Sequence, residues 1–72
     1  MDILVQERLQ MLQKEVIGQK IKKLRQEHKY TLKQLSDKTG LSTGFLSQLE
    51  RGRSNIAVDS LAKIAAVFGA GV

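Results

Sequence analysis

The sequence predicts a compact, all-α domain of four to five helices. Apolar residues recur at three- and four-residue spacing along most of the chain, which is the period of an amphipathic helix. Capping residues and glycines divide this pattern into segments at Thr31, Gly40, Ser42 and Gly69. The chain has 72 residues, no proline and no cysteine, so it can bury one small core and holds neither a disulfide nor a thiol-based metal site.

Residues 1–16 form an N-terminal arm, helical or flexible, whose apolar residues keep helical spacing. The pattern continues into the next segment, so one long helix and two helices that break near Gly18 are both open. A glycine inside a helix costs about 1 kcal/mol relative to alanine and permits such a break. Three roles fit the arm: a flexible leader, a strut on the domain, and a dimerisation helix. Its apolar residues are Val5, Leu9, Leu12 and Val16.

Residues 17–29 are expected to form the first helix of a domain that spans residues 17–69. Lysines crowd the outer face of this helix, where most of them are expected to be simply solvated. Arg25 lies at the edge of the apolar stripe, so its guanidinium can be partly buried, and a buried arginine needs a carboxylate partner. The inward-facing residues are Ile17, Ile21 and Leu24.

A short helix is predicted to follow Thr31. Gln34 stands three residues after Thr31, which is the capping-box spacing in which each side chain bonds the other residue's backbone N–H. The helix is expected to stop at Lys38 or Thr39. Gly40 can then adopt the left-handed conformation that ends a helix at little cost.

A second short helix, residues 42–51, is predicted after the turn, with Ser42 as its N-cap. Two short helices joined at a glycine have the layout of a helix-turn-helix, in which one helix braces and the next reads DNA. The rival interpretation is an ordinary helical hairpin. The expected buried face is Phe45, Leu46 and Leu49, and the opposite face is Thr43, Gly44, Ser47, Gln48 and Arg51.

A last helix is predicted over residues 58–68, after a loop at residues 53–57 that offers Arg53 as a phosphate contact. Gly69 is the expected C-cap, and the tail, residues 70–72, carries no further pattern. The residues of this helix expected to face the core are Leu61, Ile64, Ala65 and Phe68.

The balance of charge favours a polyanionic partner such as nucleic acid, because 12 lysines and arginines outnumber 7 acidic residues to give a net charge of +5. No apolar run reaches membrane-spanning length and no signal peptide is recognisable, so a cytoplasmic protein without a membrane partner is expected. His28 is the sole histidine, and neither a paired set of carboxylates nor a phosphate-binding loop is present. We therefore expect no enzyme, no cofactor and no metal site.

The chain resembles the lambda-repressor-like (Cro/cI, Xre-type) helix-turn-helix family over residues 17–68. The resemblance rests on an IxxLR segment that ends at Arg25, on LKQLSDKTGLS, on FLSQLERG, and on SLAKIAAVFG. It implies a structural ion pair between Arg25 and Glu50. It also implies a regulator that can carry a cupin-type sensor domain, so that a small-molecule effector would act only through a domain not present in this chain.

Two positions depart from the family pattern. The family usually has Pro-Ser before the last helix, where this chain has Ile56 and Ala57, so a capping hydroxyl is missing. Gly44 occupies an early position of the second motif helix, where many relatives place a long polar side chain. A glycine reads no base edge, but it lets the backbone approach DNA closely.

The resemblance implies a repressor that binds double-stranded DNA as a homodimer on an inverted repeat, with helix 42–51 in the major groove. The alternative is a protein-interaction module, such as an antitoxin or coactivator, whose arm binds the partner. The exposed polar and basic face of helix 42–51 favours DNA. The expected base contacts are Thr43, Gly44, Ser47 and Gln48, and the expected phosphate contacts are Thr31, Lys33, Gln34, Ser42, Arg51 and Arg53.

Overall fold

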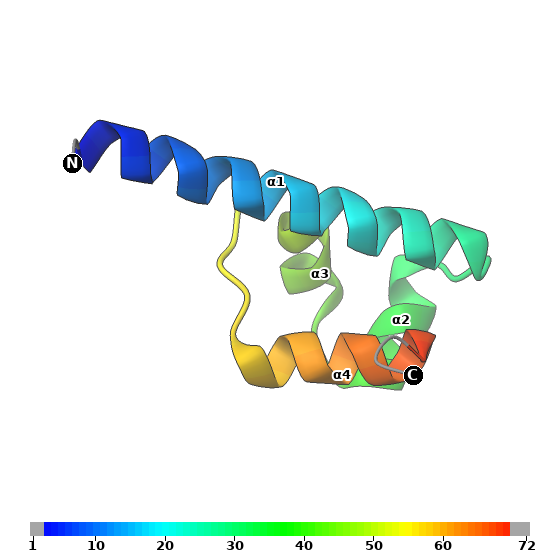
Figure 1. Ribbon diagram of the computed structural model, residues 1–72. Coiled ribbons are helices and arrows are strands. Elements are labelled where there is room, and N and C mark those ends of the chain that lie inside the picture. The colour runs from blue at the N-terminus through cyan, green and yellow to red at the C-terminus, as the bar shows by residue number, and fades with distance from the viewer. Residues whose placement is uncertain (1–2, 70–72) are drawn as a thin grey trace.

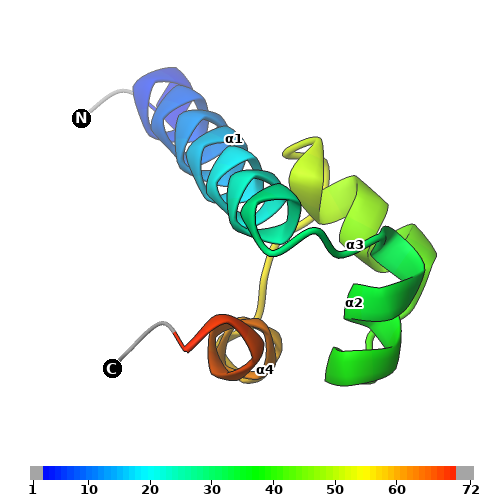
Figure 2. The same ribbon diagram turned by 90° about the vertical axis from the view of Figure 1, so that its right-hand side faces the viewer.

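The computed structural model describes residues 3–69, which form four helices. They are α1 (Ile3–Glu27), α2 (Leu32–Thr39), α3 (Thr43–Glu50) and α4 (Val58–Phe68). In Figure 1, α1 is a long rod, α3 lies beneath its middle and α4 runs along the opposite side of the molecule. Figure 2 shows α2 and α3 together, to one side of α1 and α4. The all-α prediction is confirmed, while the expected tail, residues 70–72, lies outside the described residues.

Of the two alternatives that the sequence leaves open, the structure shows one long helix. α1 starts at Ile3, passes through Gly18 without the possible break and ends at Glu27, two residues before the expected end at Lys29. Residues 3–16 are therefore helical rather than a flexible leader. Gly18 is buried where α1 crosses α3, and a Cβ atom there would collide with the carbonyl oxygen of Leu49. The glycine is thus required by a close helix crossing and does not mark the end of a helix.

The turn between α1 and α2 is fixed by backbone and cap hydrogen bonds. Lys29 adopts a positive φ of 59°, and the N–H of Tyr30 donates to the carbonyl oxygen of Arg25 at 3.0 Å. Thr31 then caps α2 by the predicted capping box: its hydroxyl accepts from the N–H of Gln34 at 3.0 Å, and the Gln34 side chain accepts from the N–H of Thr31 at 2.9 Å. These bonds set the direction in which α2 leaves α1.

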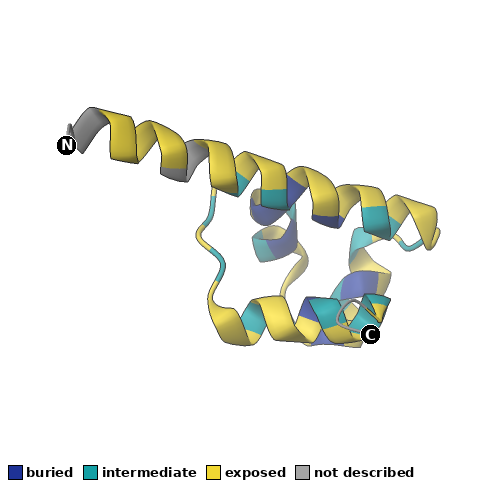
Figure 3. Ribbon diagram, in the orientation of Figure 1, coloured by how far each residue is buried: buried dark blue, intermediate teal, exposed yellow. Residues whose placement is uncertain are grey.

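The core lies where α1, α2, α3 and α4 face one another, as the dark residues of Figure 3 show. Phe45 packs against this core but is only partly buried. Leu61 faces the core side, as predicted, but it is not buried, because the residue remains 41% exposed. The buried hydrophobic residues are Ile21, Leu35, Leu46, Leu49 and Ile64.

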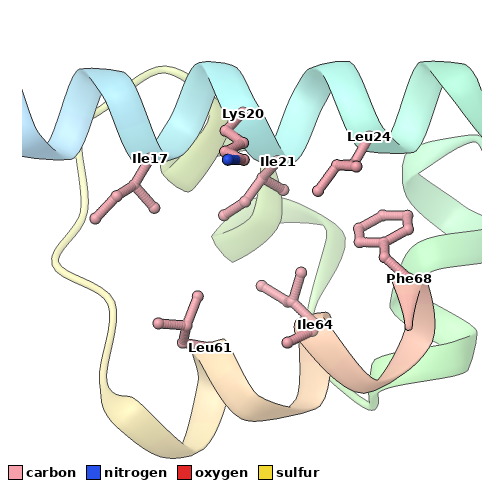
Figure 4. Close-up of a pocket in the computed structure, with 8 residues that line it drawn as sticks. Ile17, Lys20, Ile21, Leu24, Leu61, Ile64 and Phe68 are labelled. Carbon is pink, nitrogen blue, oxygen red and sulfur yellow. The ribbon is translucent and has the colours of Figure 1, made fainter. Parts of the chain in front are cut away.

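An apolar hollow between α1 and α4 explains the exposure of Leu61. The hollow has a volume of about 190 Å³ and an entirely apolar lining surface. Figure 4 shows Ile17, Ile21 and Leu24 on one side of the hollow, and Leu61, Ile64 and Phe68 on the other. Leu61 is thus directed at α1, as the spacing predicts, but nothing within residues 3–69 fills the space between them.

The start of α4 lacks a side-chain cap. Ala57 occupies the N-cap position, with extended φ and ψ angles of −75° and 154°, and it makes no side-chain cap hydrogen bond. We expect Ala57→Ser to raise the free energy of unfolding by about 1 kcal/mol, because a serine hydroxyl can accept from a free N–H of the first turn. Urea denaturation followed by circular dichroism measures the change. An unchanged or lower stability would contradict the missing-cap interpretation.

Candidate nucleic-acid interface

The outer face of α3 gathers the four residues expected to contact bases. Thr43, Gly44 and Gln48 are exposed and Ser47 is partly buried, whereas Leu46 and the other core residues occupy the opposite face. The helix itself is held by its own N-cap, Ser42, whose hydroxyl accepts from the N–H of Phe45 at 3.1 Å. The structure therefore presents short, uncharged polar groups and one bare glycine on the open side of a fixed helix.

Two helix N-termini lie beside this face and carry the expected phosphate ligands. Thr31 and Ser42 are exposed N-caps of α2 and α3. Each hydroxyl accepts one bond from its own helix, which leaves its proton free to donate to another group. The Gln34 amide likewise accepts through its oxygen and keeps two N–H donors. Helix N-termini attract anions because their first N–H groups are unpaired and carry partial positive charge.

Exposed cations occur on both helices of the motif. Lys33 is exposed in the first turn of α2, and Arg51 and Arg53 are exposed just after α3. A shallow hollow near the end of α3 brings Lys22 of α1 close to these two arginines. Its lining residues are Glu15, Gln19, Lys22, Glu50, Arg51 and Arg53.

Lys22 was missed by the sequence reasoning. On the sequence it is one of several lysines on the outer face of a basic helix, with nothing to distinguish it. Its place beside Arg51 arises from the crossing of α1 over α3, which no local pattern specifies. Three cations at one end of α3 can together contact a polyanion more strongly than any one of them.

The structure brings Arg25 and Glu50 together across the α1–α3 contact. The guanidinium Nε lies 2.7 Å from Oε2 of Glu50, and Nη2 lies 3.0 Å from Oε1, so the contact is bidentate. Nη1 also donates to the carbonyl oxygen of Tyr30 at 2.9 Å. The side chains are only 14% and 6% exposed. The hydrogen bonds with Glu50 raise the pKa of Arg25 against the opposing effect of burial. The ion pair joins the C-terminal end of α3 to α1. The bond to Tyr30 joins α1 to the segment that precedes α2.

Thr39 fixes the turn of the motif, a role that sequence reasoning also missed. Its buried hydroxyl donates to the carbonyl oxygen of Leu35 at 2.8 Å and accepts from the N–H of Leu41 at 3.1 Å. Gly40 takes the predicted left-handed conformation, with φ of 78°. Because one side chain bonds both α2 and the segment that enters α3, the angle between the two helices is well defined.

Within residues 3–69 no group of three acidic, histidine or cysteine side chains is arranged to hold a metal ion. In the same part of the chain, no helix combines the length and the apolar character needed to span a bilayer.

Comparison with known proteins identifies the family of the chain. Residues 21–71 match the Helix-turn-helix family (HTH_3). The chain is 40% identical over 53 residues to the immunity repressor protein of Bacillus phage phi105, an alignment that covers 74% of this chain and 37% of the repressor. It is 38% identical over 58 residues to the HTH-type transcriptional regulator SinR of Bacillus subtilis, covering 79% of this chain and 52% of SinR.

A third relative is the HTH-type transcriptional regulator DdrOP3 of Deinococcus deserti, which is 35% identical over 51 residues, covering 71% of this chain and 40% of that protein. The chain therefore spans about half, or less, of the length of these relatives. No solved structure gives a significant match. None of these comparisons supports the cupin-type sensor domain that the sequence led us to expect.

Proposed function

Because this chain belongs to the helix-turn-helix family, in its lambda-repressor-like (Xre/cI) branch, we propose that it is a sequence-specific DNA-binding transcriptional regulator that acts as a repressor. The observation that carries the proposal is the outer face of α3. It exposes uncharged polar side chains between the capped N-terminus of α3 and a cluster of cations that follows its C-terminal end. Such a regulator works where the chromosome lies, which in a bacterium is the cytoplasm.

In this proposal α3 enters the major groove and reads base edges. Gln48 can form two hydrogen bonds with adenine, Thr43 can bond a base or touch a thymine methyl group, and Ser47 can serve either kind of base. Gly44 has no neighbouring heavy atom within 4 Å of an added Cβ. Its bare surface therefore lets the α3 backbone approach the groove without a side chain between them.

The phosphate contacts surround this reading face. The hydroxyls of Thr31 and Ser42 and the amide of Gln34 donate to backbone oxygens, which sets the register of α3 on the duplex. The cations add a salt-sensitive attraction, because each neutralised phosphate releases counterions. These cations are Lys33, Arg51 and Arg53.

Two copies on an inverted repeat are the proposed operator complex. A single domain of this size buries little DNA, whereas two copies double both the contacts and the sequence that is read. Half-sites about one helical turn apart would place two recognition helices in successive major grooves on the same side of the duplex.

Selection from randomised duplexes tests the proposal. The purified chain is incubated with the pool at low and at physiological salt, and the bound fraction is sequenced. Enrichment of an inverted repeat is the expected result. Salt-sensitive binding without an enriched motif would overturn sequence-specific regulation and would favour the second candidate described below.

Gln48→Ala is expected to relax base preference at one position of each half-site, at a cost of about 1–3 kcal/mol for the preferred base. Arg51→Ala is the matched comparison, because Arg51 is also exposed and lies three residues further along, at the C-cap of the same helix. It should weaken binding to all sequences alike and reduce the salt dependence by about one phosphate contact. Fluorescence anisotropy with single-base operator variants separates the two effects. Unchanged preference in Gln48→Ala would contradict the assignment of α3 to the major groove.

A protein-interaction module, of the antitoxin or coactivator kind, is the second candidate function. The observation that favours it is the row of exposed apolar residues on the N-terminal half of α1. That row is compatible with DNA binding if it pairs two copies of the regulator. An effector, if the regulator has one, would act through a domain outside this chain.

A further inference from the structure

The N-terminal half of α1 carries an apolar stripe that nothing within residues 3–69 covers. We define the stripe as Val5, Leu9, Leu12 and Val16, whose side chains are 46%, 51%, 56% and 62% exposed. Figure 1 shows this half of α1 extending well beyond α4, and Figure 3 shows most of its described residues exposed. An open apolar surface of this kind on a small domain marks an interaction site.

The stripe cannot be part of the domain's own core. At 100° per residue, it lies on the side of α1 that faces away from Gly18 and Ile21, which pack against the other helices. Farther along the same side the exposed residues are Gln19 and Lys23, so the stripe ends after Val16. It is thus a bounded surface of just over three turns, on the side of α1 away from the core and separate from the outer face of α3.

Its spacing is that of a coiled-coil seam. The residues follow one another at intervals of four, three and four, which is the repeat by which two helices bury a narrow row of side chains between them. A groove on a globular partner usually takes a wider apolar face than this row provides. A second helix with the same narrow row is therefore the best fit, and a second copy of this chain supplies one.

We propose that two copies of this protein pair through the stripe as an antiparallel, two-fold symmetric helix pair. In this pairing Val5 faces Val16 of the second copy, and Leu9 faces Leu12. Each contact occurs twice because the interface is isologous. Four layers form, each with one residue from each copy, and every layer is apolar.

The charges beside the stripe select the antiparallel direction. Arg8 and Glu15 lie seven residues apart on the same edge of the stripe, and neither takes part in an ion pair within residues 3–69. Antiparallel pairing places Arg8 against Glu15 of the second copy, and by symmetry it does so twice. Parallel pairing would instead set Arg8 against an uncharged Gln13 and Glu15 against Lys20, so that Arg8 would lose its partner, and it would bring the two Lys23 side chains together, which is unfavourable.

The pairing would also fix the distance between two recognition helices, a consequence that rests on the proposed function. The two Gly18 residues, at which α3 crosses α1, would lie about 22 Å apart along the helix pair, at about 1.5 Å per residue. Each domain packs on the side of α1 away from the other copy, so the two α3 helices lie farther apart than this. A separation greater than about 22 Å between the two α3 helices is compatible with the spacing of about 34 Å between half-sites one helical turn apart.

Sedimentation equilibrium of the intact 72-residue chain without DNA tests the pairing. We expect a dimer, and we expect Leu12→Glu to raise its dissociation constant at least tenfold, because the substitution places a carboxylate in two of the four layers. Gln13→Glu is the matched control: it adds the same charge one position along, beside the stripe, and should change the constant less than about threefold. Since Leu12 is exposed in the single chain, the variant should keep a cooperative thermal transition.

Charge reversal tests the direction. Arg8→Glu and Glu15→Arg should each weaken the dimer, and the two together should restore it, because the antiparallel pair then regains both ion pairs in reverse. In a parallel pair the double variant would not recover. A monomer at concentrations near 100 µM, a dimer unaffected by Leu12→Glu, or a double variant that fails to recover would overturn the proposal.

Sedimentation equilibrium and the duplex selection, both done on the same chain, test the pairing and the proposed function independently. A monomer that still enriches a DNA motif would refute the pairing and leave the regulator intact. A dimer that enriches no motif would refute the regulator and leave the pairing intact.

Discussion

Arg25→Met is expected to destabilise the protein by about 3–5 kcal/mol, enough to unfold most of a domain of this size at room temperature. The substitution leaves the carboxylate of Glu50, which is 6% exposed, without the two hydrogen bonds of the guanidinium. It also removes the donor to the carbonyl oxygen of Tyr30. An uncompensated buried charge is far more costly than the pair is stabilising, since desolvation offsets much of the attraction between the two groups.

Removal of both charges distinguishes the effect of a lost ion pair from the effect of lost packing around Arg25. Arg25→Met combined with Glu50→Leu removes both charges and should recover much of the stability, because apolar replacements of a buried pair are often neutral or better. Lys23→Met is the surface control. Its ion pair with Glu27 is 4.0 Å long between side chains 78% and 54% exposed, and the change should cost less than about 0.5 kcal/mol.

Urea denaturation followed by far-ultraviolet circular dichroism measures all three variants. If Arg25→Met cost no more than Lys23→Met, the pair would not hold α3 to α1, and the arrangement of the reading helix would depend on the apolar core alone. If the double variant stayed as unstable as the single one, the loss would come from packing or from the bond to Tyr30 rather than from the stranded carboxylate.

The parts of the fold that sequence predicts well are those with a local cause. The ends of α2 follow from Thr31, Gln34 and Gly40, because the hydrogen bonds that stop and start a short helix join residues only three or four apart. The N-cap of α3 at Ser42 and the uncapped start of α4 at Ala57 have the same origin. The outer face of α3 could likewise be identified from the spacing of its buried residues.

The parts that sequence misses depend on contacts between distant elements. Leu61 has the spacing of a core residue, but whether it is buried depends on what fills the space between α1 and α4. Lys22 joins the cations after α3 only because α1 crosses there. The stripe on the arm has helical spacing that is equally typical of a core face and of an intermolecular seam, and only the structure shows which side of α1 the core occupies.

Gly18 is the residue at which local helix propensity and tertiary packing lead to the most different expectations. By local propensity it permits a helix break, yet the helix continues through it and α3 passes directly beneath. Gly18→Ala should improve the intrinsic propensity of α1 by about 1 kcal/mol. Its Cβ would nevertheless collide with the carbonyl oxygen of Leu49 and lie 2.9 Å from that of Glu50. Because both are backbone atoms, α3 as a whole must move away, and overpacking of this kind typically costs about 1–3 kcal/mol.

The cost exceeds the gain, so we expect Gly18→Ala to lower the free energy of unfolding by about 1 kcal/mol and a larger side chain to lower it further. Gly44→Ala is the matched control. It is also a glycine inside a helix, but an added Cβ meets nothing within 4 Å, so stability should rise by roughly 0.5–1 kcal/mol. The two changes are chemically identical and differ only in what lies opposite. A loss at Gly44 or a gain at Gly18 would contradict the close crossing.

The same pair of variants also separates stability from DNA binding. Gly44→Ala places a methyl group on the proposed reading face, so it should stabilise the protein while weakening its affinity for the operator. Gly18→Ala shifts α3 relative to α1 and strains the pair between Arg25 and Glu50, so stability and affinity should fall together. If Gly44→Ala left operator affinity unchanged, the backbone of α3 would not approach the groove at that point, and contact would rest on the side chains of Thr43, Ser47 and Gln48.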